Sequence, residues 1–261
     1  MTKEEALGKL LTSKNYKDFC PDTVKSEFEK QLAKRNNVAE AEKYTRERLH
    51  AMSGAFMSAA ELKAARKCLI RFAEGDETAL ADALLLHASS RERMNVLHEL
   101  YETVFSVTGK PESVLDAACG LNPLYLGSLG IPRVTATDLH GALTDLISDW
   151  AKAANWNISA YCSDLSLSVP EGKFDLCLLM KLLPVLETNE KGSAMKLLSG
   201  INARFFLVTF PTRTLGGRRV NMEESYTNWF QTNLPAHYRV LKRFTLGSEL
   251  IYILEKTEET V

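Results

Sequence analysis

The stretch VLDAACGLNP, residues 114–123, decides the fold of this 261-residue chain. Its apolar residues end in the acid Asp116 and are followed by small residues, which let the backbone turn and approach a ligand closely. In α/β folds, nucleotide-type cofactors bind at the carboxyl ends of strands. A dinucleotide site would carry the pattern GxGxxG, whereas Ala118 and Asn122 flank Gly120 here. The stretch therefore predicts a strand, a turn and a helix. The turn is either purely structural or, with Ala118 and Gly120, part of a nucleoside site.

Short apolar runs alternate with helical stretches beyond this motif, which indicates β-α-β units and a parallel sheet covered on both faces. Two last runs are separated only by Gly247 and Ser248. Such a short link requires antiparallel pairing, because a parallel crossover needs about a dozen residues or more. We expect an α/β fold with a seven-stranded sheet that ends in an antiparallel hairpin, the arrangement of class I, Rossmann-like methyltransferases. The predicted strands are residues 113–117, 133–137, 158–162, 174–180, 204–210, 238–246 and 249–255.

The residues before the motif read as a series of helices. Two sequences, Ser58 to Glu61 and Ser89 to Glu92, have the pattern of a capping box at a helix start. Residues 1–72 contain fifteen lysines and arginines against ten acids, although the whole chain has a net charge of −1. A basic end on an acidic body suggests an anionic partner. We predict an all-helical domain at 1–75 that docks on RNA, followed by the sheet domain at 76–261.

Composition limits the other possibilities. The chain is 45% hydrophobic and 25% charged, which is ordinary for a soluble globular protein. Its five cysteines include no CxxC pair, so we expect reduced thiols and no metal site. No apolar run approaches the roughly 18 residues that a membrane span needs. The first residues, MTKEEALGKLL, do not resemble a signal peptide. We therefore predict a cytoplasmic protein.

Acids follow two further predicted strands. Asp138 ends the second strand, where a carboxylate can accept hydrogen bonds from both hydroxyls of a ribose. Asp164 follows the third strand, where it can accept from an adenine amine while Leu165 offers an apolar wall. Each acid alone is more often a helix cap or a turn residue. Acids at three successive strand ends, with Asp116 as the first, favour a cofactor site.

Basic residues at the later strand ends and in the helical region are candidates for RNA contact. The loop at 210–219 has two glycines and three arginines, and arginine suits phosphates and base edges because its guanidinium is planar. An ordinary solvated loop is the alternative. Lys181 either contacts a phosphate or is simply exposed at the end of the fourth strand. The predicted RNA-binding residues are Lys63, Arg66, Lys67, Lys181, Arg213, Arg218 and Arg219.

Several stretches together resemble the Arm/Rmt family of aminoglycoside-resistance 16S rRNA methyltransferases, which act on N7 of guanine 1405. The resemblance covers most of the chain, and the strings ACGLNPL and FPTRxLGGR are not general methyltransferase features. The matching stretches are CPDTV at 20–24, RLH at 48–50, LHAS at 86–89, ACGLNP at 118–123, KLLP at 181–184, GSAM at 192–195 and FPTRTLGGR at 210–218.

The resemblance implies S-adenosylmethionine as the cofactor and the 30S ribosomal subunit, at the decoding region of its 16S rRNA, as the partner. It implies that Arg93 pairs with the methionine carboxylate of the cofactor. Glu190 departs from the family pattern, in which we expect glutamine, so that outer contact is left out of the site. The cofactor contacts expected from the motifs and the resemblance together are Phe56, His87, Ala88, Ser89, Arg93, Ala118, Gly120, Asp138, Asp164, Leu165 and Leu182.

Methylation of guanine N7 needs no proton removal before attack, because this nitrogen carries a free lone pair. We therefore expect no catalytic side chain that acts as an obligatory base, and the task of the enzyme is positioning. Two kinds of alternative remain. The chain could methylate adenine N1 in the same rRNA region or a small molecule, or it could be a non-catalytic ribosome-binding factor on the same fold. Members of this family would confer resistance to 4,6-disubstituted deoxystreptamine aminoglycosides.

Overall fold

The computed structural model describes residues 1–53, 56–212 and 222–257. Its centre is a sheet with the strand order β3-β2-β1-β4-β5-β7-β6. The first five strands in this order are parallel, and β7 pairs antiparallel with both β5 and β6. The strands are β1 Ser113–Ala117, β2 Arg133–Asp138, β3 Ile158–Cys162, β4 Phe174–Met180, β5 Ala203–Pro211, β6 Tyr238–Leu246 and β7 Glu249–Lys256. The predicted seven-stranded sheet and its terminal hairpin are confirmed.

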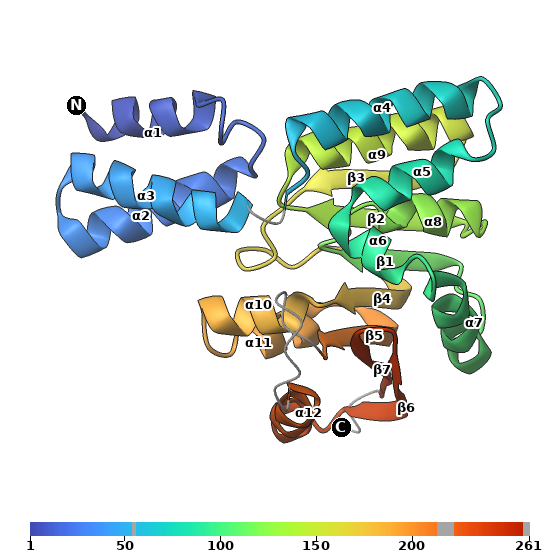
Figure 1. Ribbon diagram of the computed structural model, residues 1–261. Helices are drawn as coiled ribbons and strands as arrows, with labels where there is room; N and C mark the ends of the chain where they lie inside the picture. The colour runs from blue at the N-terminus through green and yellow to red at the C-terminus, as the bar shows by residue number, and fades with distance from the viewer. Residues whose placement is uncertain (54–55, 213–221, 258–261) are drawn as a thin grey trace.

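Helices cover both faces of the sheet (Figure 1). One face is covered by α7 (Leu97–Thr108), α8 (Asn122–Ser128) and α9 (Gly141–Ala154). The other face is covered by α10 (Leu182–Asn189), α11 (Ser193–Gly200) and α12 (Met222–Asn233). Both faces of β1 and β4 are therefore buried, which explains why most residues of these strands are apolar.

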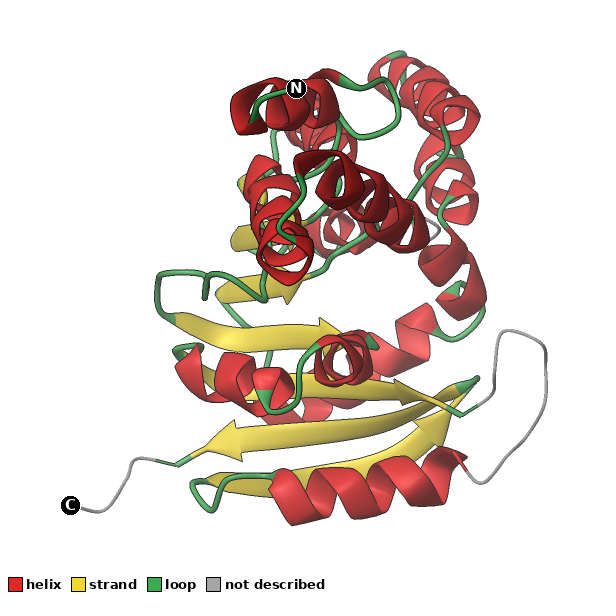
Figure 2. Cartoon of the chain, turned by 90° about the vertical axis from the view of Figure 1, so that its left-hand side faces the viewer, coloured by secondary structure: helices red, strands yellow, loops and turns green. Residues whose placement is uncertain are grey.

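The first three helices form a unit of their own beside the ends of the strands. They are α1 (Lys3–Thr12), α2 (Pro21–Arg35) and α3 (Val38–Ser53). Their shared core includes Leu10, Phe28 and Leu49, all fully buried. We call α1–α3 the helical unit. Figure 2, which views the molecule from this side, shows the helical unit together with the twist of the sheet.

Helix α4 (Ala59–Ala73) packs on the sheet domain and lies along α9 (Figure 1). Its Phe72 ring lies 4.9 Å from the ring of Trp150, which is fully buried in α9. Helix α5 (Ala79–Leu86) belongs to the same apolar cluster. Packing therefore groups α4 with the sheet, whereas the predicted division at residue 75 falls after this helix. The division of the chain into domains stays a prediction, and packing favours a boundary before α4.

The two predicted capping boxes have different outcomes. At the first, Ser58 caps α4, since its hydroxyl accepts from the Glu61 backbone and the Glu61 carboxylate accepts from the Ser58 backbone at 2.7 Å. The second was wrong. Helix α6 (Ala88–Arg93) already contains Ser89 and ends before α7, and no side chain caps its start. Within the described residues, no helix is long and apolar enough to cross a membrane.

Candidate functional site

The turn after β1 is built for close approach. Ala118 and Gly120 both have left-handed backbone angles, with φ of 56° and 54°. A Cβ atom at Gly120 would lie 2.6 Å from Cε1 of His87, so only glycine fits beneath this ring. Cys119 N donates to the carbonyl of Thr137 at 3.0 Å, which ties the turn to β2. Ala118, exposed at the carboxyl end of β1, is the residue of this turn that a ligand can reach.

Asp138 lies at the end of β2 beside this turn. One carboxylate oxygen accepts from Gly120 N at 3.1 Å and the other from His140 N at 3.0 Å. Burial raises the pKa of Asp138 above its ordinary value, and these backbone N–H groups oppose the rise because they stabilise the charged form. A carboxylate has about four acceptor positions, so both oxygens can still accept a further hydrogen bond. This arrangement fits two adjacent hydroxyl groups.

Asp164 follows β3 and has fewer free acceptor positions than Asp138. One oxygen accepts from the backbone N and the hydroxyl of Ser166, at 2.9 and 2.6 Å. The other oxygen accepts from the hydroxyl of Thr23 at 2.8 Å. These three donors, counted among the described residues, leave room for about one more. Leu165 is buried next to it and joins the same apolar cluster as Leu182. The arrangement fits a single donor, such as one amine hydrogen.

His87, Ala88 and Ser89 reach the site from the start of α6. The Ser89 hydroxyl lies 2.8 Å from Nδ1 of His87 and holds the ring over Gly120. Burial and the nearby positive charge of Arg93 lower the pKa of His87 to about 4. The ring is therefore neutral near pH 7. Ala88 is exposed beside it.

Four charged side chains form a cluster at the β4–β7 end of the same edge. The buried Glu249 carboxylate accepts from Arg93 Nε at 2.7 Å and from Arg93 Nη2 at 3.3 Å. Lys181 Nζ lies 3.4 Å from Glu249 and also pairs with Glu92. Lys181 is thus held by two carboxylates, and its predicted phosphate contact stays a prediction. Sequence reasoning missed Glu249, although an acid at the first position of an apolar strand is an available signal.

An aromatic group joins the helical unit to the loop after β2. The Phe56 ring stacks on the His140 ring with centroids 4.5 Å apart, and the Phe19 ring lies 4.5 Å from Phe56. Backbone hydrogen bonds support the contact, since Cys20 N donates to Leu139 O at 2.9 Å. Phe56 therefore lies next to the loop of Asp138, as its predicted role requires. Sequence reasoning missed the contacts that Phe19 and His140 make with Phe56.

The acid of the central motif is closed off from the site. Asp116 is buried and accepts from Nδ2 of Asn122 at 2.6 Å, while Asn122 is also hydrogen-bonded to the hydroxyl of Tyr101. Burial raises the pKa of Asp116 to about 7. Of the three strand-end acids, Asp138 and Asp164 thus have hydrogen-bonding capacity to offer a ligand, whereas Asp116 supports the turn from within.

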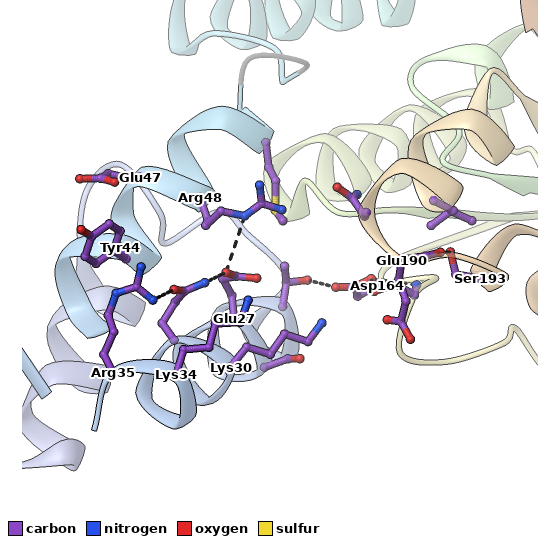
Figure 3. Close-up of a pocket in the computed structure, with 17 residues that line it drawn as sticks. Glu27, Lys30, Lys34, Arg35, Tyr44, Glu47, Arg48, Asp164, Glu190 and Ser193 are labelled. Atoms are coloured by element: carbon purple, nitrogen blue, oxygen red, sulfur yellow. Dashed lines mark hydrogen bonds and ion pairs between the residues drawn. The ribbon is translucent and has the colours of Figure 1, made fainter. Parts of the chain in front are cut away.

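A pocket of about 400 Å³ lies where the helical unit meets the loop of Asp164 (Figure 3). Lysines and arginines of α2 and α3 line one wall. The Arg35 guanidinium lies 3.5 Å over the Tyr44 ring, and Arg48 is 3.7 Å from Glu27. The opposite wall includes Asp164 and Glu190. The basic lining residues are Lys30, Lys34, Arg35 and Arg48.

The predicted RNA contacts lie elsewhere. Lys63, Arg66 and Lys67 are exposed on α4, and Arg66 pairs with Asp149 of α9 at 2.8 Å. These three positions stay predictions. The other predicted arginines lie outside the described residues; they are Arg213, Arg218 and Arg219.

Comparisons with known proteins show which family the chain resembles along its length. The sequence model of the family described as "Ribosomal RNA methyltransferase (FmrO)" matches residues 12–253. A 16S rRNA (guanine(1405)-N(7))-methyltransferase of Serratia marcescens is 40% identical over 98% of this chain and 99% of its own. The crystal structure of the 16S rRNA methyltransferase RmtF with S-adenosyl-L-homocysteine has a TM-score of 0.89 and 45% identity, over 98% of both chains. The structure of the 16S rRNA methylase RmtB has a TM-score of 0.87 and 36% identity, over 98% of this chain and 99% of that one.

Proposed function

The chain belongs to the FmrO family of ribosomal RNA methyltransferases, and we propose that it methylates N7 of guanine 1405 in 16S rRNA with S-adenosylmethionine as methyl donor. The relatives that support this proposal span nearly the whole chain and carry this activity in their names. The observation in the structure that carries it is the pair Asp138 and Asp164 at neighbouring strand ends.

The residues at this edge fit an adenosine group. Asp138 has acceptor capacity on both oxygens for the two ribose hydroxyls, and Asp164 has about one position for the adenine amine. Leu165 supplies apolar surface beside Asp164, and Phe56 supplies it beside the loop of Asp138. The left-handed turn at Ala118 places backbone atoms, and no large side chain, at the carboxyl end of β1.

The β4–β7 end fits the amino-acid part of the cofactor. A guanidinium has two edges that can each bind a carboxylate. Glu249 occupies the Nε edge of Arg93, and the other edge remains for the methionine carboxylate. S-adenosylmethionine, when bound, supplies a methyl group activated by its sulfonium. Leu182, buried at the start of α10, closes the site from the side of β4.

The chain's own side chains need only position the guanine. Its N7 lone pair is free at neutral pH, so no base has to remove a proton first. His87, a titratable ring in this region, is held by Ser89 and has its pKa lowered to about 4. It therefore stays neutral at physiological pH and acts as part of the cofactor shell.

Docking on the 30S subunit at the decoding region would use the basic surfaces. The candidates are the pocket wall formed by α2 and α3 and the exposed cations of α4. Phosphate contacts of this kind release counterions, so binding should weaken as salt rises. A ribosomal substrate also supports the expectation that the protein works in the cytoplasm.

The direct test incubates the purified chain with 30S subunits and methyl-labelled S-adenosylmethionine, and then maps the modified nucleotide. We expect one label at N7 of guanine 1405. A label on an adenine would replace the proposed target with another rRNA position. Cofactor binding without any label would favour the non-catalytic ribosome-binding alternative. Asp138→Ala is the control, because it removes the ribose acceptor and should abolish labelling.

A cellular consequence follows from the proposed target. A methyl group with a positive charge at this guanine would obstruct 4,6-disubstituted deoxystreptamine aminoglycosides sterically and electrostatically. Bacteria that express the chain should therefore resist gentamicin and kanamycin. Unchanged susceptibility in cells shown to contain the soluble protein would contradict the proposal.

A further inference from the structure

A hydrogen bond crosses from the helical unit into the candidate cofactor site. Thr23 lies in the first turn of α2, and its hydroxyl donates to Asp164 Oδ2 at 2.8 Å. Figure 3 marks this bond with the dashed line that ends on Asp164. Thr23 is 3% exposed. Water therefore has little access to its hydroxyl, and the bond is not easily replaced by solvent.

The same segment of the chain also contacts the loop of the other acid. Cys20 N donates to Leu139 O at 2.9 Å, and Gly141 N donates to Asp18 O at 2.7 Å. These two bonds flank His140, whose backbone N–H holds Asp138. Residues 18–23 thus attach the helical unit to the sheet at both acids that fit adenosine.

The orientation of Asp164 depends on this bond. Ser166 supplies two donors, but both bind Oδ1 and leave the position of Oδ2 to be set by rotation about the Cβ–Cγ bond. Thr23 is the donor on Oδ2 among the described residues. With both oxygens held, the plane of the carboxylate is fixed, and one acceptor position on Oδ2 remains for a ligand.

We propose that Thr23 is a positioning residue which orients Asp164 toward the adenine amine, so that the helical unit completes the cofactor site. The inference rests on the proposed function, since it takes the adenosine of S-adenosylmethionine as the ligand of Asp164. It gives the helical unit a second role besides docking. Because binding free energies are reciprocal, movement of α2 on RNA would change the affinity for the cofactor, and bound cofactor would hold α2 in place.

The test compares two ligands by calorimetry. One is S-adenosylhomocysteine, and the other is its analogue in which hydrogen replaces the 6-amino group of adenine. Thr23→Val should weaken the first about tenfold, which is the size of one charge-assisted hydrogen bond, and change the second less than about twofold. Thr23→Ser should restore the wild-type ratio of the two affinities. The ratio does not depend on the folded fraction, so a less stable variant still gives an answer.

A matched control lies in the same unit. Thr45 is fully buried in α3, and its hydroxyl donates to Ala41 O at 2.7 Å, away from Asp164. Thr45→Val should leave the ratio unchanged. Equal weakening of both ligands by Thr23→Val, or no weakening of either, would overturn the inference. So would a full effect of Thr23→Val in a chain that already carries Asp164→Ala. Failure of the wild type to bind S-adenosylhomocysteine would instead overturn the proposed function.

Discussion

The two ends of the sheet's carboxyl edge are built in opposite ways. At the β2–β3 end, Asp138 and Asp164 are held by backbone N–H groups and hydroxyls, and no cation of the described residues is paired with either acid. At the β4–β7 end, Arg93 and Lys181 share the buried carboxylate of Glu249. Neutral donors leave a carboxylate with its charge and spare acceptor positions. An ion pair instead fixes the position of a cation and neutralises part of its charge.

The difference teaches which part of a ligand each end can select. Free acceptor positions at the β2–β3 end favour donors such as ribose hydroxyls and an amine. A held guanidinium at the β4–β7 end favours a carboxylate that matches the edge which Glu249 does not occupy. Four experiments test this contrast.

The largest expected effect comes from the β2–β3 end. Asp138→Ala should weaken S-adenosylhomocysteine binding by at least about 2–3 kcal/mol, because two hydroxyls lose a charged acceptor. Calorimetry gives the affinity, and circular dichroism should show an intact fold. Asp175→Ala is the matched control. That acid accepts from Glu112 N and Ser113 N at the opposite edge of the sheet, so its loss should spare the affinity. Near-wild-type affinity of Asp138→Ala would show that the ribose does not bind this acid.

The next largest effect is on the pH dependence of stability and concerns Asp116. This acid lies between the two ends of the edge and is buried away from both. Its pKa is about 7 in the folded chain and would be near 3.9 unfolded. The folded state thus binds the proton more tightly, and the resulting stability is lost as pH rises through 7. Asp116→Asn should remove this loss, which is on the order of 2 kcal/mol between about pH 5 and 8. Denaturant unfolding of both chains at these two pH values checks it; parallel pH profiles would contradict it.

A smaller effect is expected at the β4–β7 end. Glu249→Gln should weaken S-adenosylhomocysteine about tenfold, since Arg93 loses the partner that fixes its guanidinium. Binding of 5′-methylthioadenosine, which lacks the carboxylate, should not change. Glu255→Gln is the control. Glu255 lies in β7 like Glu249 but near the other end of the strand, where it pairs with Arg204 and Arg239. Tighter binding to Glu249→Gln would mean that Glu249 competes with the ligand for Arg93.

No effect at all is expected from titration of His87. Its pKa of about 4 keeps the ring neutral, and guanine N7 needs no base. The single-turnover rate on saturating 30S subunits should stay nearly flat from about pH 6.5 to about 8.5, the range around an ordinary histidine titration. A tenfold rise through a pKa near 6.5 that disappears in His87→Gln would show that the ring takes part in proton transfer.

The sequence predicted the sheet almost to the residue, because buried parallel strands appear as short apolar runs between turn signals. Strand β2 extends only to Asp138, one residue past its predicted end. The acids Asp138 and Asp164 could also be found, since Asp138 ends its strand and Asp164 lies two residues after the end of its strand. Their surroundings could not. Thr23 lies 141 residues before its partner Asp164 and Glu249 lies 156 residues after Arg93, and no local pattern reports such pairs.

The helices show the same limit in another form. The period of Leu62, Leu69 and Phe72 indicates an apolar face on α4 but not which element covers it. The second capping box failed for a local reason. The Ser89 hydroxyl lies 2.8 Å from the His87 ring two residues before it, so it does not cap the helix start that its sequence suggests. Residue patterns thus predict which face is buried, and tertiary contacts decide its partner.

The packing of α4 on Trp150 has a practical consequence for inhibitor screening. A shortened protein that begins at Asp76 would expose this tryptophan and invite aggregation, whereas one that begins at Ser58 keeps the tryptophan covered. The second fragment would still lack residues 18–23, and with them the Thr23 donor on Asp164 Oδ2. If Asp164 binds the adenine amine as proposed, compounds selected on this fragment would be matched to a carboxylate held only through Oδ1, and they would lose potency on the whole chain.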